Sequence, residues 1–247
     1  MRTFKTMLKT ELKLSLRGMD MLIFAICLPV VMVILLGIIY GSSMAYDGAE
    51  YTFLEQSFGA ISTIAICAGG VMGLPLLISD YRQKKILKRF KVTPISPSLI
   101  LAVHLVIYAI YSVVSLIFIY FVATVIFKCQ LGGSLLGFLG SYLLVMLSMF
   151  SIGMMVGGIA PNMKAASIVA SLLYFPMLIF SGATLPYEIM PTSLQRFVNI
   201  LPLTQGIKLL KATSLGLPVD SVLSSIIILS LLAIICSSIS IKFFRWE

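Results

Sequence analysis

Charge is scarce in this chain, and negative charge is the scarcest. Of its 247 residues only 11% are charged, 9 are Asp or Glu, 1 is His, and 60% are hydrophobic. A water-soluble globule needs a more polar surface, so most of the chain is expected to lie in a lipid bilayer. A membrane-embedded enzyme would need clustered acids, bases or a nucleophile, and His104 has no acidic neighbour in the sequence. We therefore expect no catalysis, and we expect His104 to pack in the protein or lie at an interface rather than bind a substrate.

Cysteine is sparse as well, since only Cys27, Cys67, Cys129 and Cys236 occur. They show no close pairing, and three of them fall in long apolar runs, where cysteine behaves as a small apolar residue. We expect neither a disulfide nor a metal site. No apolar run carries Asp, Glu, Lys or Arg near its centre, which disfavours an ion-driven carrier or a channel. No exposed basic domain is visible, so nucleic-acid binding is not expected.

Long apolar runs are abundant. A bilayer crossing takes about 20 residues, and the runs predict an all-α integral membrane protein with transmembrane helices at residues 21–40, 58–78, 99–127, 135–159, 165–180 and 222–241. Placing the N-terminus inside puts 14 of the 18 Lys and Arg residues on that side, so both termini are predicted to be cytoplasmic and near anionic lipid. The start of the chain is too polar for a cleaved signal, so the first span is expected to remain.

The segment 1–20 has an apolar and a polar side at helical spacing. The apolar side carries Phe4, Met7, Leu8, Leu12 and Leu14. The polar side carries Arg2, Lys5, Lys9, Lys13 and Arg17. This pattern predicts an amphipathic helix on the cytosolic face of the membrane, which either only anchors the chain or also contacts a cytosolic partner. The remaining residues, 21–247, are expected to form a single membrane domain.

The connection between the second and third spans, residues 80–97, reads DYRQKKILKRFKVTPISP and carries six cations. Ile86, Leu87 and Phe90 recur at helical spacing, which predicts a short helix along the membrane surface that ends before Pro94. Lipid headgroups alone would hold such a helix, and a cytosolic protein would also dock on it. The residues by themselves leave both interpretations open.

Residues 181–220, between the fifth and sixth spans, are apolar but interrupted by prolines. The interruptions are Pro186, Pro191, Pro202 and Pro218. Two short helices are expected, one that begins with a capping box of Thr192 and Gln195 and runs to about residue 200, and one over 203–214. Because irregular backbone at membrane depth must be shielded by protein or a cavity, the segment is predicted to be re-entrant from the outer side.

Two smaller patterns each have two interpretations. The G-x-x-x-G spacings of Gly133 with Gly137 and Gly153 with Gly157 allow helices to approach closely, either within one protomer or at a dimer contact. The acidic residues before the second span form either a solvated loop or a patch that attracts a cationic substrate. These residues are Asp47, Glu50 and Glu55.

Three stretches, in order, resemble one family: the membrane subunits, or permeases, of type-2 ATP-binding-cassette (ABC) exporters. KRFKVTPIS, 88–96, is similar to the family's cytosolic coupling segment. FPMLIFSGATLPYEIMP, 175–191, resembles its fifth span and outer turn, and LPLTQGIKLLKA, 201–212, resembles the short helix before its last span. The resemblance covers nearly all of the chain. Family members often carry Glu and Gly within the basic segment, where this chain has Gln83, Lys84 and Lys85.

The resemblance implies a homodimer or heterodimer of six-span halves, in a bacterial cell membrane, bound to two cytosolic ATPase subunits. The chain has no G-x-x-x-x-G-K-[ST] phosphate loop, so ATP and Mg are expected on the partner, with no cofactor in this chain. The coupling residues implied are Arg82, Lys84, Ile86, Leu87, Lys88, Arg89 and Phe90. The apolar members are expected to insert into a groove of the ATPase, and the basic members to supply rim charge.

Polar and aromatic residues within the spans are the candidates for a substrate path. They are Tyr108, Tyr111, Ser112, Ser115 and Tyr174. Such residues more often form bonds between helices. The short outer loops favour a hydrophobic or amphiphilic substrate, such as a drug, an antimicrobial peptide or a lipid-like molecule, moved out of the cell. The alternative is a non-transporting membrane scaffold or assembly subunit that docks a cytosolic partner through the same basic segment.

Overall fold

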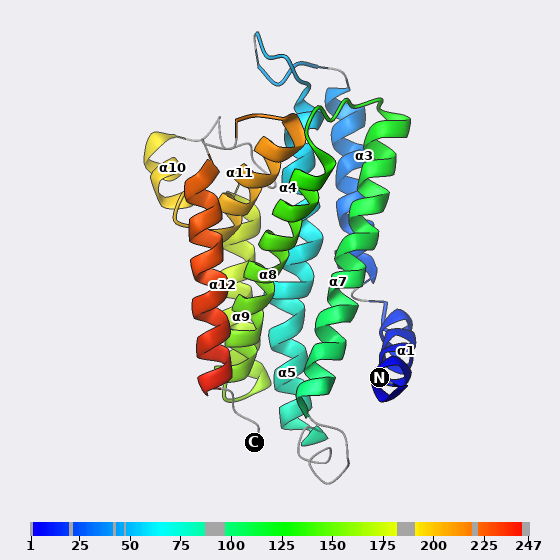
Figure 1. Cartoon of the computed structure of the whole chain (residues 1–247), viewed down its shortest axis with the longest axis vertical. Helices are drawn as coiled ribbons and strands as arrows, with labels where there is room; N and C mark the ends of the chain where they lie inside the picture. The colour runs from blue at the N-terminus through cyan, green and yellow to red at the C-terminus, as the bar shows by residue number, and fades with distance from the viewer. Residues whose placement is uncertain are drawn as a thin grey trace.

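The computed structural model describes residues 2–19, 22–41, 43–46, 48–86, 97–181, 191–218 and 222–243. Long helices run side by side and form a bundle (Figure 1). The α-helices are α1 (Arg2–Arg17), α3 (Leu28–Tyr40), α4 (Phe53–Cys67), α5 (Leu74–Gln83), α7 (Pro97–Phe121), α8 (Leu135–Ile159), α9 (Met163–Phe180), α10 (Thr192–Val198), α11 (Pro202–Leu215) and α12 (Leu223–Phe243). Wider, π-helical turns continue three of them: η1 (Ile23–Cys27), η2 (Ala68–Gly73) and η3 (Val122–Ile126). The described residues contain no β-strand.

In the described part of the chain, six helices are long and apolar enough to cross a membrane, which agrees with the predicted number of spans. They are Ile23–Tyr40, Phe53–Gln83, Ser98–Ile126, Leu135–Ile159, Met163–Phe180 and Leu223–Phe243. The second begins five residues before its predicted start and runs on to Gln83. Its early start has a local cause, because Thr52 caps α4 and forms a capping box with Glu55. The helix also continues through Pro75 for a local reason. The π-helical turn η2 ends just before α5, so Pro75 lies in the first turn of α5, where a residue without an N–H is tolerated.

The bundle has two distinct ends. One end, here called the terminal end, holds α1, the end of α5, the start of α7, the α8–α9 turn and the end of α12 (Figure 1). The other, here called the far end, holds the α3–α4 loop, the α7–α8 loop, α10 and α11 (Figure 1). The segments that were predicted to share a side of the membrane therefore share an end of the bundle.

The continuous helix α4–η2–α5 lies in the centre of the bundle. In its most apolar stretch of 18 residues 78% of the residues are buried, whereas the corresponding share is 22% in the first and fifth spans and 17% in the last. Glycines permit the close packing around it. A Cβ on Gly153 of α8 would lie 1.8 Å from the carbonyl oxygen of Gly70, and one on Gly157 would lie 3.0 Å from Pro75 Cα. A Cβ on Gly133 would meet the carbonyl oxygen of Thr213 at 1.8 Å. Gly153 and Gly157 thus pack α8 on the central helix within the protomer, and Gly133 packs the α7–α8 loop on α11.

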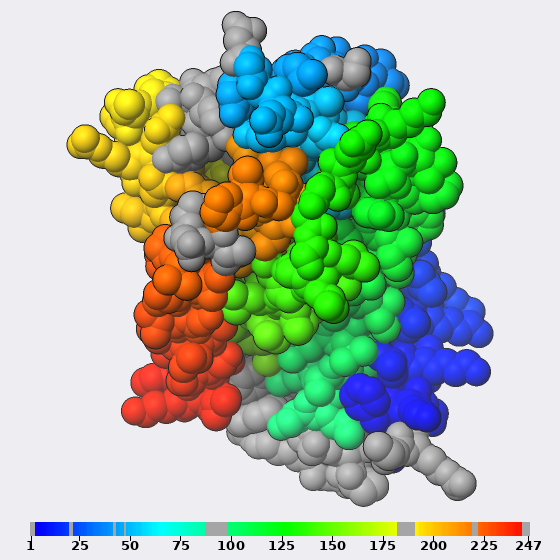
Figure 2. Space-filling view, turned by 45° about the horizontal axis from the view of Figure 1, so that its top comes forward, coloured from blue at the N-terminus to red at the C-terminus, as the bar shows by residue number. Residues whose placement is uncertain are grey.

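Helices α10 and α11 lie close to their predicted positions at the far end. The predicted capping box at Thr192 is wrong, because Thr192 is already the first helical residue and Pro191 occupies the N-cap without a side-chain bond. α11 is mostly buried by α4, α8 and α12, and in Figure 2 it lies, in orange, between α10 in yellow and the loop before α4 in blue. Gln205 ties it on two sides, since its Nε2 donates to Asn199 O at 2.6 Å and its Oε1 accepts from Ser225 Oγ at 2.8 Å.

The N-terminal segment forms the helix α1, while its predicted place on the cytosolic face of the membrane stays a prediction. Phe4, Met7, Leu8 and Leu12 are partly buried against the bundle, whereas Leu14, which was predicted on the same side, is 60% exposed. Docking on protein therefore takes up much of the apolar face of α1.

Candidate functional site

The last turn of α5 is where the basic segment begins. Of the seven coupling residues that the resemblance implied, the structure describes Arg82, Lys84 and Ile86, while 87–90 lie outside the described residues. Lys84 ends α5 as its C-cap, and Lys85 follows with a φ of +56°. A lysine in this left-handed region costs of order 1 kcal/mol, so the sharp turn out of α5 must be held by neighbouring contacts. Lys85 N donates to Arg82 O at 2.9 Å within that turn.

Arg82 points into the bundle and not outward. It is 8% exposed, and its guanidinium donates to three carbonyl oxygens at the end of α8. Nη2 bonds Gly157 O at 2.9 Å and Gly158 O at 3.1 Å, and Nη1 bonds Ala160 O. The last carbonyls of a helix have no partner within it, and a cation there also interacts favourably with the helix dipole. Arg82 therefore caps α8, and it is not among the side chains that α5 presents outward.

Tyr81, the preceding residue, faces the opposite way and contacts α1 and α7. Its hydroxyl donates to Glu11 Oε2 at 3.3 Å, and His104 Nε2 lies 3.1 Å from the same hydroxyl oxygen. With Tyr81 donating to Glu11, His104 Nε2 must carry a hydrogen and donate to Tyr81. Glu11 Oε2 is also 3.7 Å from His104 Nε2. The expectation that His104 packs in the protein is confirmed, since it is 4% exposed, but it has an acidic neighbour that comes from 93 positions earlier in the chain.

Lys84 completes the turn on the outside. Its Nζ is 2.8 Å from Asp80 Oδ2, and its side chain is 64% exposed. An exposed pair of this kind contributes well under about 1 kcal/mol. Tyr81, Arg82 and the Asp80–Lys84 pair thus make contacts in different directions at the end of α5, and of these side chains Lys84 is the exposed one.

The five predicted path residues all lie in the interior of the protomer. Tyr108 is 5% exposed, Tyr111 3%, Tyr174 7%, and both Ser112 and Ser115 0%. Tyr111 shares a hydrogen bond of 3.0 Å with Ser15 of α1. The carbonyl oxygen of Ser112 accepts from Tyr142 OH of α8 at 2.8 Å. Tyr111 and the backbone of Ser112 therefore join helices, whereas the buried hydroxyls of Ser112 and Ser115 have no hydrogen-bond partner among the described residues. None of the five residues lines either of two cavities that lie between the helices.

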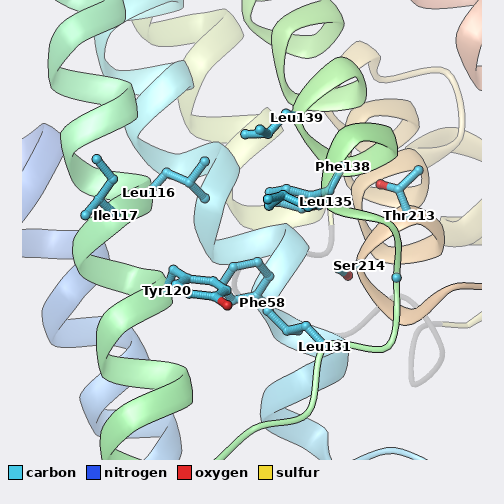
Figure 3. A pocket seen from close by; sticks show the side chains of 11 residues that line it. Phe58, Leu116, Ile117, Tyr120, Leu131, Leu135, Phe138, Leu139, Thr213 and Ser214 are labelled. Atoms are coloured by element: carbon cyan, nitrogen blue, oxygen red, sulfur yellow. The ribbon is translucent and has the colours of Figure 1, made fainter.

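Sequence reasoning did not indicate these two cavities. One, of about 350 Å³, lies between α4, α7, the start of α8 and α11 in the half nearer the far end (Figure 3). Phe58 forms its floor, with ring centroids 6.4 Å from Tyr120 and 5.5 Å from Phe138. The other, of about 390 Å³, lies between α7, α8 and α12. Both linings are mostly apolar and come from three or more separate helices, so no local pattern in the sequence signals them.

Of the three acidic residues predicted before the second span, Glu55 is buried and bonded, Glu50 is exposed, and Asp47 lies outside the described residues. Glu55 is 7% exposed and uses both carboxylate oxygens, accepting from Thr52 N at 2.7 Å and from Gln130 N at 2.5 Å. It thereby ties the start of α4 to the α7–α8 loop. Burial and the Glu55 carboxylate raise the pKa of the neighbouring Cys129 thiol to about 11. Among the described residues, no group of three His, Cys, Asp or Glu is placed to hold a metal ion.

A family model described as ABC-2 type transporter matches residues 2–215. The chain belongs to the ABC-2 type transporter family. The matched region begins with α1 and ends with α11, so it contains five of the six spans and the whole of the basic segment.

Two relatives share part of this ABC-2 chain. Nodulation protein J of Rhizobium leguminosarum bv. viciae and Nodulation protein J of Neorhizobium galegae are each 36% identical to it over 76 residues. The match covers 31% of this chain and 29% of each relative's length. This similarity is confined to less than a third of either protein.

Family and fold together establish the general role. With six membrane-crossing helices, this ABC-2 family member is a multi-pass membrane component of an ABC transporter. ABC-2 membrane subunits work with an ABC ATPase and are generally not catalytic themselves.

Proposed function

We propose that the chain is the permease subunit of an ATP-driven exporter in a bacterial cell membrane, which moves a hydrophobic or amphiphilic substrate outward. The observation that carries the proposal is the family match, which spans the chain from α1 to α11. ATP and Mg are bound by a separate ATPase, present in two copies, because this chain has no phosphate loop. A second permease copy, identical or related, completes the membrane part. The amphipathic helix at 1–20 and the six-span domain at 21–247 act as one permease unit.

The terminal end faces the cytosol in this proposal. The described cations of that end are Arg2, Lys5, Lys9, Lys13, Arg17, Arg82, Lys84, Lys85, Lys164 and Lys242. Those of the far end are Lys128, Arg196, Lys208 and Lys211. Lys and Arg next to spans are retained in the cytoplasm, so this asymmetry favours a cytosolic terminal end.

The ATPase docks on the basic segment. Ile86, Leu87 and Phe90 insert into a groove of the partner, and Lys84, Lys88 and Arg89 contribute charge at the rim. The outward-facing, exposed Lys84 supports this arrangement. Arg82, which was predicted among the coupling residues, is not part of the docking surface, because its guanidinium is buried against α8.

The substrate path lies outside the protomer core. Since all five predicted path residues are buried within one chain, the path is formed by faces that one protomer leaves exposed, with a second copy opposite. The first, fifth and last spans offer the largest exposed faces. These faces are almost wholly apolar, which suits a substrate that is taken from the membrane.

The test is the purification of the tagged protein from its native membrane in mild detergent. The co-purifying proteins are identified, and vanadate-sensitive ATP hydrolysis is measured in the eluate. We expect a roughly stoichiometric ATPase that is lost in Leu87→Asp and Phe90→Asp. Met44→Asp is the control, since Met44 is 61% exposed in a far-end loop and should leave the ATPase bound. An eluate without ATPase would favour the scaffold alternative. An ATPase retained by both variants would place its docking surface elsewhere.

A further inference from the structure

The basic segment is joined to the rest of the bundle at the end of α5. We propose that Arg82 is a positioning residue that locks the root of the basic segment to the end of α8 and the start of α9, so that these elements move as one unit. It rests on the proposed function in one respect, namely that the ATPase acts on the basic segment. The lock itself is a property of this chain and is testable without a partner.

The contact is built to hold two helix ends together. The guanidinium is planar and presents up to five donors in a fixed fork, so one side chain bonds the oxygens of Gly157, Gly158 and Ala160 at once. Hydrogen bonds from a charged donor are stronger than neutral ones, and Arg82 is only 8% exposed, which limits competition from water.

The surroundings of Arg82 make the joint stiff. Gly157 has no side chain, and a Cβ there would already lie 3.0 Å from Ile78 Cδ1 and from Pro75 Cα. The backbones of α5 and α8 are therefore in direct contact next to the guanidinium. Packed interfaces of this kind do not deform continuously, so a displacement of one helix end is passed to the other.

The joint extends to α9 because the connection from α8 is very short. α8 ends at Ile159, and Asn162 already caps α9, with its Oδ1 accepting from Ala165 N at 2.8 Å. On the opposite side of the same turn, Tyr81 bonds Glu11 of α1. The root of the basic segment is thus fastened on both sides, and Arg82 is its connection to α8 and α9.

The first experiment measures the joint in the purified permease in lipid nanodiscs. Spin labels are placed at Lys84→Cys and Lys164→Cys, two exposed positions on either side of the contact, with the accessible Cys27 and Cys129 changed to Ser. With Arg82 present, we expect a narrow distribution of the distance between the two spin labels. The distribution should be clearly broader in Arg82→Met and intermediate in Arg82→Lys, because a single ammonium group lacks the forked donors of a guanidinium. Lys85→Met removes the same charge from an exposed neighbour and should change nothing. An unbroadened distribution in Arg82→Met overturns the proposal.

The second experiment adds the co-purified ATPase and compares the nucleotide-free and ATP–vanadate states. The maleimide labelling rate is measured at single cysteines introduced at position 164 and at the exposed position 83, which is not among the proposed docking residues. We expect both rates to change with the nucleotide when Arg82 is present, and only the rate at 83 to change in Arg82→Met. A merely structural role would alter stability but not separate the two responses. If position 164 still responds in Arg82→Met, Arg82 does not transmit the movement.

The two experiments fail separately. An absent ATPase would remove the proposed function, while the distance measurement would still decide whether Arg82 fixes the joint. Should Arg82→Met not give monodisperse protein, Arg82→Lys carries the test. In that case a distribution as narrow as that of the unsubstituted protein would overturn the role of the guanidinium fork, and a broader one would support it.

Discussion

Replacing Gly153 by alanine should separate the two helices at the centre of the protomer. A Cβ at this position would lie 1.8 Å from the carbonyl oxygen of Gly70 and 3.2 Å from Leu74 Cβ. Both clashing partners belong to the continuous central helix, and one of them is backbone, so no side-chain rotation relieves the contact. Real Cβ atoms essentially never approach closer than 3.0 Å, so α8 must move away by more than about 1 Å.

The expected cost follows from the behaviour of overpacked cores. Inserted methyl groups typically cost about 1–3 kcal/mol, and a clash with backbone lies at or above the upper end of that range. For a chain of this size, each kcal/mol shifts the midpoint of thermal unfolding by about 2–4 °C, which gives a decrease of roughly 6–12 °C. Gly140→Ala is the matched control on the same helix, because a Cβ there meets nothing within 4 Å. That variant should be neutral or gain up to about 1 kcal/mol from better helix propensity.

Thermal unfolding in detergent is followed with a thiol-reactive dye that reaches Cys67 only when the bundle opens, since Cys67 is 0% exposed. The dye also reports unfolding through the buried Cys236, and serines replace the accessible Cys27 and Cys129. Gly153→Ala should release the signal well below the temperature for Gly140→Ala. Equal midpoints for the two variants would refute the packing of α8 against the central helix that the structure shows.

Three further predictions follow from individual contacts. In Glu55→Gln, one of the two backbone N–H groups that donate to Glu55 loses its acceptor, which should lower the free energy of unfolding by about 1–3 kcal/mol. The control Glu50→Gln, at an exposed position, should change it little. Thermal unfolding measures both variants. Tyr81→Phe removes the hydrogen bonds of the Tyr81 hydroxyl to α1 and α7 and should lower the free energy of unfolding by about 1–3 kcal/mol. The control Tyr46→Phe, at a residue that is 55% exposed, should lower it by less than about 0.5 kcal/mol. The Cys129 thiol, with its pKa raised to about 11, stays protonated at neutral pH, so its alkylation rate should rise steadily from pH 7 to 10; a plateau near pH 9 would contradict the raised pKa.

The six spans could be predicted because a bilayer crossing imposes length and hydrophobicity together. Their ends were predicted less well where capping decides them. Residues 53–57 include a glutamate, a glutamine and a serine, so hydropathy alone starts the second span at Phe58, whereas the capping box at Thr52 starts the helix at Phe53. A similar pattern, a Thr followed three residues later by Gln, failed at Thr192, because Pro191 is already the N-cap of α10 and its carbonyl accepts from Gln195 N at 3.0 Å.

The candidate site shows where sequence reasoning stops. A run of cations between two spans indicates which segment is basic, but it does not indicate the direction of each side chain. Arg82 and Lys84 are two positions apart on α5, so they lie about 200° apart around the helix axis, and one faces α8 while the other faces outward. Glu11 and His104 are likewise separated in sequence by the first two spans, and only the docking of α1 on the bundle brings them together.

The buried polar residues of α7 have a consequence for how such a subunit opens. A tyrosine or serine in a span has the same appearance in sequence whether it faces a lumen or a neighbouring helix. Here Tyr111 bonds Ser15 of α1, and the Ser112 carbonyl receives Tyr142 of α8. Breaking these contacts would leave buried polar groups unpaired, at about 1–3 kcal/mol each. Arg82 likewise joins α5 to α8, so buried polar contacts link α7 to α1, α7 to α8 and α5 to α8, and separating any of these pairs is costly. The protomer should therefore shift largely as a block, and a path for substrate should open at its exposed faces, where no polar contact has to be broken.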